Sequence, residues 1–222
     1  MELNYFALII ITLVLGFGAQ AMIKHTYRKW DKTPSSSGIS GAQAARRMLD
    51  ANGLSNVSIT QVAGELSDHY DPRTNVVSLS ASVYDSHSVS AIAVACHECG
   101  HAVQTAQGYV PGKVRSAIVP VVSFASNIWM LALILGIIMS ILGLIYLAIA
   151  LFAAVLIFQL VTLPVEFNAS RRALAFIQQS GWLTAGENSG AASVLRAAAL
   201  TYVAAALASV LQLIYLLGMA RR

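Results

Sequence analysis

The feature that most constrains this chain is a long segment without any ionisable side chain. From Ser116 to Val165 the sequence contains no Asp, Glu, Lys, Arg or His. About twenty apolar residues in a helix cross the hydrocarbon core of a membrane. The segment can therefore form two spanning helices, with a tight turn that we place between Gly136 and Gly143. Leu3–Ile23 and Ala197–Met219 are further apolar segments of spanning length. Four transmembrane helices are predicted, in agreement with a chain that is 57% hydrophobic and 11% charged.

The first apolar segment resembles either a signal peptide or a membrane anchor. Ala19-Gln20-Ala21 has the small residues of a cleavage site, but Met1-Glu2-Leu3-Asn4 lacks the positive charge with which signal peptides begin. Positive charges follow the segment instead, which favours an anchor with its N-terminus outside. Four spans then place residues 24–115 and 166–196 together in the cytoplasm, and those segments hold twelve of the fourteen Lys and Arg residues.

The distribution of charge also indicates which kind of partner the chain is expected to contact. The net charge of +4 follows from the membrane topology, and contact with anionic lipid head groups explains it without a nucleic-acid partner. The predicted organisation is a transmembrane anchor (1–23), a cytoplasmic α+β domain (24–115), two transmembrane helices (116–165), a cytoplasmic helix and loop (166–196), and a last transmembrane helix with its tail (197–222). The sequence does not predict the oligomeric state.

The cytoplasmic segments carry recognisable helix and strand signals. A helix capped by Ser40 is expected to end at Asn52-Gly53, and a second helix to run from Ser88 to Gln107. Two β-type runs lie between them, separated by a segment rich in turn residues. The remaining expectations are strands over Asn56–Val62 and Asn75–Ser80, a helix starting at Pro164 and closed by Gly181, and a loop over residues 182–193.

The second of these helices contains His97-Glu98-Cys99-Gly100-His101, an H-E-x-x-H sequence. At about 100° per residue the two histidines lie one helical turn apart on one face, so both imidazoles can reach a single metal ion. Glu98 flanks the same face, where a carboxylate can act on an attacking water. Buried polar side chains without partners are costly, and a bound cation would compensate for this burial. We therefore predict a zinc site rather than a chance match.

The same helix carries Cys96 and Cys99 in C-x-x-C spacing. Their mean direction is roughly 150° from that of the histidine pair, so cysteines and histidines cannot bind the same ion. Covalent haem attachment would need C-x-x-C-H, and Gly100 interrupts that pattern. The cytosolic location argues against a disulfide, and both cysteines are expected to face the core as small apolar residues.

A catalytic zinc site takes three protein ligands and keeps one position open. The metzincin pattern is excluded, because Gln107 stands where its third histidine would be. No histidine follows His101, and the only later acids are Glu166 and Glu187. Glu187 lies in a polar stretch, whereas Glu166 begins a segment on the same side of the membrane as the histidines. Elimination selects Glu166 as the third ligand. The structural alternatives for Glu166 are to stabilise a helix N-terminus or to pair with Arg171. Three upstream side chains also remain open as ligands: His69, His87 and Asp71.

Three segments together resemble the YugP-type neutral zinc metallopeptidases, a family of membrane-bound proteins in the gluzincin-like group. They are GELSDHYDPRTNVVSLS, SVSAIAVACHECGHAVQ and PVEFNASRRAL. The resemblance implies an α-helical membrane protein with about four transmembrane helices and a small α+β zincin-like cytoplasmic domain. It also implies one Zn²⁺ ion held by His97, His101 and Glu166, with Glu98 as the catalytic acid/base. Cys99 departs from the bulkier apolar residue common in zincin helices. Ser170 stands where related membrane zincins often place an aspartate, so Asn168 and Ser170 are the candidates to orient a ligand histidine.

The activity expected from these residues is that of a zinc metalloendopeptidase, EC 3.4.24.-, in a multi-pass protein of the cell membrane, by resemblance a bacterial inner membrane. The apolar part of the motif helix stops at Glu98, which argues against cleavage inside the bilayer. Peptides or membrane proteins near the cytoplasmic surface are the expected substrates, and Asn75–Ser80 is a candidate edge strand for binding them. Two alternatives remain: a catalytically silent metal-binding scaffold or regulatory protein, and a transporter, which the lack of charge in the second and third spans weakens.

Overall fold

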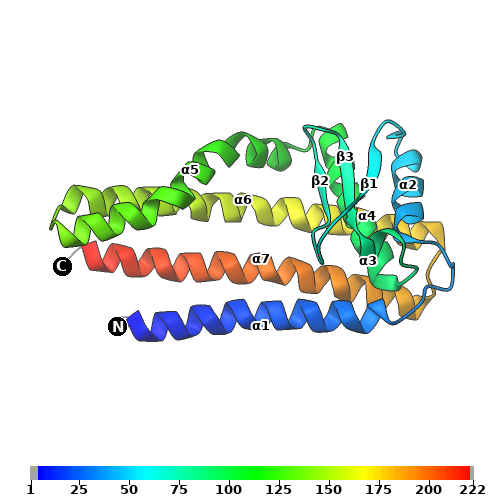
Figure 1. The fold of residues 1–222 in the computed structure, drawn as a ribbon, viewed down its shortest axis with the longest axis horizontal. Coiled ribbons are helices and arrows are strands. Elements are labelled where there is room, and N and C mark those ends of the chain that lie inside the picture. Colours follow the sequence, from blue (N-terminus) through cyan, green and yellow to red (C-terminus); the bar gives the residue numbers. More distant parts are fainter. Residues whose placement is uncertain (1–4, 221–222) are drawn as a thin grey trace. The chain divides into compact units, whose positions relative to one another are not determined.

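The protein is mainly helical, with one small sheet (Figure 1). The computed structural model describes residues 5–220. Its elements, in chain order, are α1 (Tyr5–Asp31), α2 (Gly41–Ala51), β1 (Ser58–Val62), β2 (His69–Asp71), β3 (Val76–Ser80), α3 (Ala81–Tyr84), α4 (Val89–Ala106), α5 (Val110–Ile138), α6 (Leu142–Ser180) and α7 (Ala185–Ala220).

Four helices of the described chain are long and apolar enough to cross a membrane: α1, α5, α6 and α7. This confirms the predicted fold class. The turn between α5 and α6 falls at residues 139–141, between the two glycines predicted to flank it. The helices extend beyond the predicted spans, since α1 continues to Asp31 and α5 starts at Val110. The predicted start of the first span, Leu3, lies outside the described residues.

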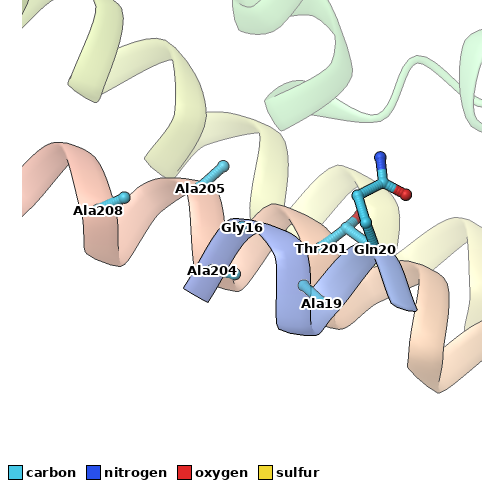
Figure 2. Close-up of a pocket in the computed structure, with 7 residues that line it drawn as sticks. All are labelled: Gly16, Ala19, Gln20, Thr201, Ala204, Ala205 and Ala208. Atoms are coloured by element: carbon cyan, nitrogen blue, oxygen red, sulfur yellow. The ribbon is translucent and has the colours of Figure 1, made fainter. Parts of the chain in front are cut away.

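The described chain divides into two compact units. The helical unit comprises residues 5–20, 113–164 and 200–220, and the site unit comprises residues 21–112 and 165–199. Within the helical unit, the ring centroids of Trp129 and Phe152 lie 4.7 Å apart in an apolar cluster. A cavity of about 220 Å³ between α1 and α7 is lined mainly by small side chains (Figure 2): Gly16, Ala19, Gln20, Thr201, Ala204, Ala205 and Ala208.

The site unit is built around a three-stranded sheet in the order β1-β3-β2. β3 pairs in parallel with β1 and antiparallel with β2. Val77 and Leu79 of β3 are fully buried, and they join a core that includes α2, α4 and parts of α6 and α7. α2 begins with a capping box in which the Ser40 side chain accepts from the Gln43 main chain, and its C-cap is Asn52, where the sequence predicted the end of the helix. α4 likewise begins after Ser88, which caps Ala91.

The sheet corrects one prediction about substrate binding. β3 is the central strand, so the proposal that Asn75–Ser80 offers a free edge is wrong. The edge beside it is formed by β2, a strand that lies in the segment expected to be only turns. A three-residue strand is too short to show the alternation of apolar and polar residues by which strands are predicted.

Two further predictions about helix boundaries are wrong. Pro164 does not begin a new helix, because α6 passes through it without a break. Proline is tolerated inside long apolar helices, where neighbouring groups satisfy the freed backbone atoms. Residues 185–193, predicted as loop, form the first turns of α7. Thr184 and Glu187 make a reciprocal capping box there, with side chain to main chain distances of 3.3 and 2.7 Å.

Candidate metal centre

Two helices of the site unit carry the candidate ligands. His97 and His101 lie on α4, and Glu166 lies on α6 just beyond the charge-free segment. The helices approach closely at Gly100, between the two histidines. A Cβ atom added at Gly100 would lie 2.7 Å from the main-chain oxygen of Ala169 on α6. The absence of a side chain at Gly100 therefore allows the contact that brings Glu166 to the histidines.

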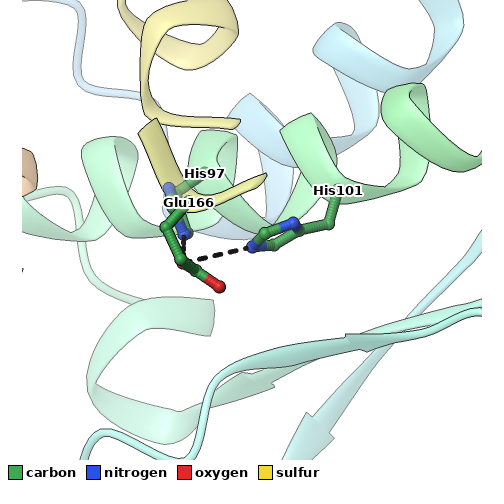
Figure 3. Close-up of side chains that lie close together, drawn as sticks. All are labelled: His97, His101 and Glu166. Carbon is green, nitrogen blue, oxygen red and sulfur yellow. Dashed lines mark hydrogen bonds and ion pairs between the residues drawn. The ribbon is translucent and has the colours of Figure 1, made fainter. Parts of the chain in front are cut away.

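The three side chains converge on one point (Figure 3). The Oε2 atom of Glu166 lies 3.2 Å from His97 Nε2 and 3.6 Å from His101 Nε2. One ligand atom from each residue lies within 4.8 Å of the others, and Glu166 is only 3% exposed. The imidazole rings meet edge to face, with centroids 4.8 Å apart. Two helices distant in sequence thus present three electron-pair donors to a shared space.

This arrangement fits a zinc ion. Zinc binds imidazole nitrogen and carboxylate oxygen at about 2.0–2.2 Å in tetrahedral geometry, so neighbouring ligand atoms should lie about 3.3–3.6 Å apart. The two distances to Glu166 lie close to the ends of this range, and the three ligand atoms all lie within 4.8 Å of one another. Two nitrogens and one oxygen are also the donor set of known catalytic zinc sites that keep a fourth position open.

The electrostatics of the three residues are coupled. Burial alone would lower the pKa of His101, but its hydrogen bond with Glu166 and the negative charges of Glu98 and Glu166 raise that pKa overall. Burial would likewise raise the pKa of Glu166, but hydrogen bonds from His101 and His97 outweigh it and the net pKa is lowered. The Glu166 carboxylate is therefore negatively charged. This charge attracts a cation, which can be a proton or a metal ion.

Each histidine has a different partner on its second nitrogen. His97 Nδ1 lies 3.1 Å from the Ser170 hydroxyl, one of the two candidates to orient a ligand. His101 Nδ1 lies 3.0 Å from Oε1 of Gln104, a residue that was not among the predicted candidates for this role. The other candidate, Asn168, accepts a hydrogen bond from Gln104. The sequence could have indicated Gln104, because it is a polar residue three positions after His101 on the same face of an apolar helix.

The remaining sequence candidates lie apart from this cluster among the described residues. His69 Nδ1 is bonded to the Ser67 carbonyl and His87 Nδ1 to that of Gly38. Asp71 pairs with Arg73. Glu187 accepts hydrogen bonds from the main chain and hydroxyl of Ser36 at 2.9 and 2.7 Å.

Both cysteines are free and fully buried, as predicted. Burial raises the pKa of the Cys96 thiol and of the Cys99 thiol far above its ordinary value. Cys99 Sγ lies 3.5 Å from the Ala45 carbonyl on α2, away from the histidine face. The thiols therefore pack α4 into the core and remain protonated.

Comparison with known proteins agrees with these observations. Residues 5–221 match the family described as "Putative neutral zinc metallopeptidase". The chain is 49% identical over 207 residues to the "Putative membrane protease YugP" of Bacillus subtilis (strain 168), which covers 93% of this chain and 92% of the relative. No solved structure matches. The H-E-x-x-H helix, the convergent glutamate, the four apolar helices and this identity together show that the chain belongs to the neutral zinc metallopeptidase family.

Proposed function

We propose that this protein is a zinc metalloendopeptidase that cleaves peptides or membrane proteins at the cytoplasmic surface of the cell membrane. The observation that carries the proposal is the convergence of His97, His101 and Glu166 at spacings suited to one zinc ion. Family membership supports the same reaction class. His97 and His101 would hold the ion through Nε2, and Glu166 through Oε2.

A bound zinc ion would supply Lewis acidity, which lowers the pKa of water and polarises the scissile carbonyl. Glu98 supplies the proton transfer. It lies next to His97 on α4 and is 9% exposed. Its carboxylate takes a proton from the attacking water and delivers it to the nitrogen of the leaving amine. Glu166 would take no part in the proton transfer and would hold the ion as a charged carboxylate.

The proposed location follows from the chain itself. The charge-free segment ends at Val165 and the third ligand is the next residue, within the continuous helix α6. A ligand directly after a spanning segment should lie near the surface of the bilayer. The Lys and Arg distribution supports a cytoplasmic position for that surface. Substrates anchored in, or held close to, the membrane would reach such a site most readily.

The test compares metal content and peptide cleavage in the purified full-length protein. Glu98→Gln should retain zinc and lose cleavage, because the amide cannot accept the proton. Glu166→Ala should lose most of its zinc. Glu65→Gln, in an exposed turn of the same unit, is the matched control and should retain both properties.

Two results would contradict the proposal. Full zinc occupancy in Glu166→Ala would remove Glu166 as a ligand. Zinc binding without cleavage of a broad peptide set by the wild-type protein would favour the silent metal-binding scaffold instead.

A further inference from the structure

Gln104 is almost completely buried and has a partner at each end of its side-chain amide. Its Oε1 lies 3.0 Å from His101 Nδ1, and its Nε2 lies 2.8 Å from the Val165 carbonyl and 3.0 Å from Asn168 Oδ1. Resting on the proposed function, we infer that Gln104 is a positioning residue. It selects the protonated nitrogen of His101 and ties α4 to the part of α6 that carries Glu166.

The neighbours of Gln104 determine which way its amide points. A main-chain carbonyl only accepts hydrogen bonds, so the Nε2 donor must face Val165. Arg172 only donates, and its Nε lies 2.7 Å from Asn168 Oδ1. That oxygen therefore faces both Arg172 and Gln104 as an acceptor. The reversed amide would place Oε1 of Gln104 against two acceptor oxygens, which leaves Oε1 directed at His101.

This orientation decides where His101 carries its proton. Since Oε1 of Gln104 can only accept, Nδ1 of His101 must donate. In the neutral ring, which is the form that binds a metal ion, the lone pair is then on Nε2, and Nε2 faces Glu166 and the candidate metal position. Without Gln104 the neutral ring could place its proton on Nε2 beside the carboxylate, and a metal ion would have to displace it. Partners of this kind fix the tautomer and raise the metal affinity of ligand histidines.

The tautomer of His97 is selected less strictly than that of His101. Its Nδ1 partner is the hydroxyl of Ser170, at 3.1 Å, and a hydroxyl can either donate or accept. Ser170 holds the ring in place without selecting a tautomer. On the Nδ1 side, therefore, Gln104 selects the tautomer of His101, whereas Ser170 does not select that of His97.

Gln104 also acts on the position of the third ligand. Val165, whose carbonyl it binds, directly precedes Glu166 in α6. The hydrogen bond thus joins the helix that carries the histidines to the main chain beside the carboxylate. Gly100, one turn before Gln104 on α4, contacts Ala169, one turn after Val165 on α6. The two contacts hold the helices together along the length of the site.

The experiment uses the full-length protein in detergent, with Gln104→Met to remove all three side-chain hydrogen bonds and Gln104→Glu to keep only the acceptor. Gln178→Met, at an exposed position of α6, is the matched control. Zinc affinity is measured by competition with a chromophoric chelator. In the zinc-loaded protein, the His101 Nδ1 proton is followed by NMR with ¹⁵N-labelled histidine.

We expect Gln104→Met to lower zinc affinity about 10- to 100-fold and to expose the His101 Nδ1 proton to rapid exchange with water. Gln104→Glu should retain the slowly exchanging proton and recover part of the affinity, and Gln178→Met should match the wild type. Unchanged affinity and a protected proton in Gln104→Met would overturn the inference. If that variant does not fold, rapid exchange in folded Gln104→Glu would overturn it instead. Because neither measurement depends on hydrolysis, both can succeed even if the protein cleaves no peptide.

Discussion

Replacing Gly100 by alanine tests how the two helices set the geometry of the candidate metal centre. The new Cβ would lie 2.7 Å from the Ala169 oxygen and 3.1 Å from its carbonyl carbon and Cα. Ordinary van der Waals contact begins at 3.4 Å. The main chain of α6 must therefore retreat by about 0.7 Å at the oxygen, because Ala169 meets the new atom with backbone rather than with a flexible side chain.

This shift of α6 is large compared with the variation in ligand spacing that a zinc site allows. Transmitted in full, it would widen the 3.2 and 3.6 Å distances from Glu166 to the histidines to about 3.9 and 4.3 Å, beyond the tetrahedral spacing. Overpacking of this kind typically costs about 1–3 kcal/mol. In the zinc-free protein α4 and α6 can move apart and so avoid this cost. Zinc binding needs the two helices close together, so the cost lowers zinc affinity by roughly 5- to 150-fold. Helix propensity favours alanine by about 1 kcal/mol, so the thermal stability of the zinc-free variant should change little.

The assay is zinc competition with the full-length protein in detergent, and circular dichroism confirms the helix content. Gly186→Ala is the control, because it makes the same substitution in α7, where nothing lies within 4 Å of the added atom. Zinc binding by Gly100→Ala as tight as in the control would refute the argument that this contact sets the ligand spacing.

Three other predictions concern single groups near the site. Ser170→Ala removes the hydroxyl beside His97 Nδ1 and should lower zinc affinity about tenfold, whereas Ser170→Thr should retain it in the same competition assay. Zinc affinity should begin to fall at a pH above the ordinary imidazole value of about 6.5, because the pKa of His101 is raised and a proton competes for Nε2; a titration that stays flat down to about pH 6 would contradict this. Cys96 and Cys99 should resist iodoacetamide in the folded protein and react after denaturation, because burial raises the pKa of each thiol; mass spectrometry of the labelled chain distinguishes the two states.

Local patterns were sufficient for much of this protein. The four long apolar helices follow from runs of side chains that cannot be exposed to water, and Ser40 and Ser88 mark helix starts because their hydroxyls satisfy main-chain N–H groups. Local patterns did not predict the elements whose pattern covers only a few residues. The three residues of β2 carry no period, and the Thr184–Glu187 capping box lies in a stretch otherwise typical of a loop.

The sequence by itself determined which residues could bind a metal. Helical spacing alone places His97 and His101 on one face, and only two acids follow them in the chain. Only the tertiary structure decided how those residues meet. The close approach of α4 and α6 at Gly100 and the hydrogen bonds of Gln104 join segments more than sixty positions apart. Contacts between such distant segments depend on the packing of whole helices, which no local pattern of residues encodes.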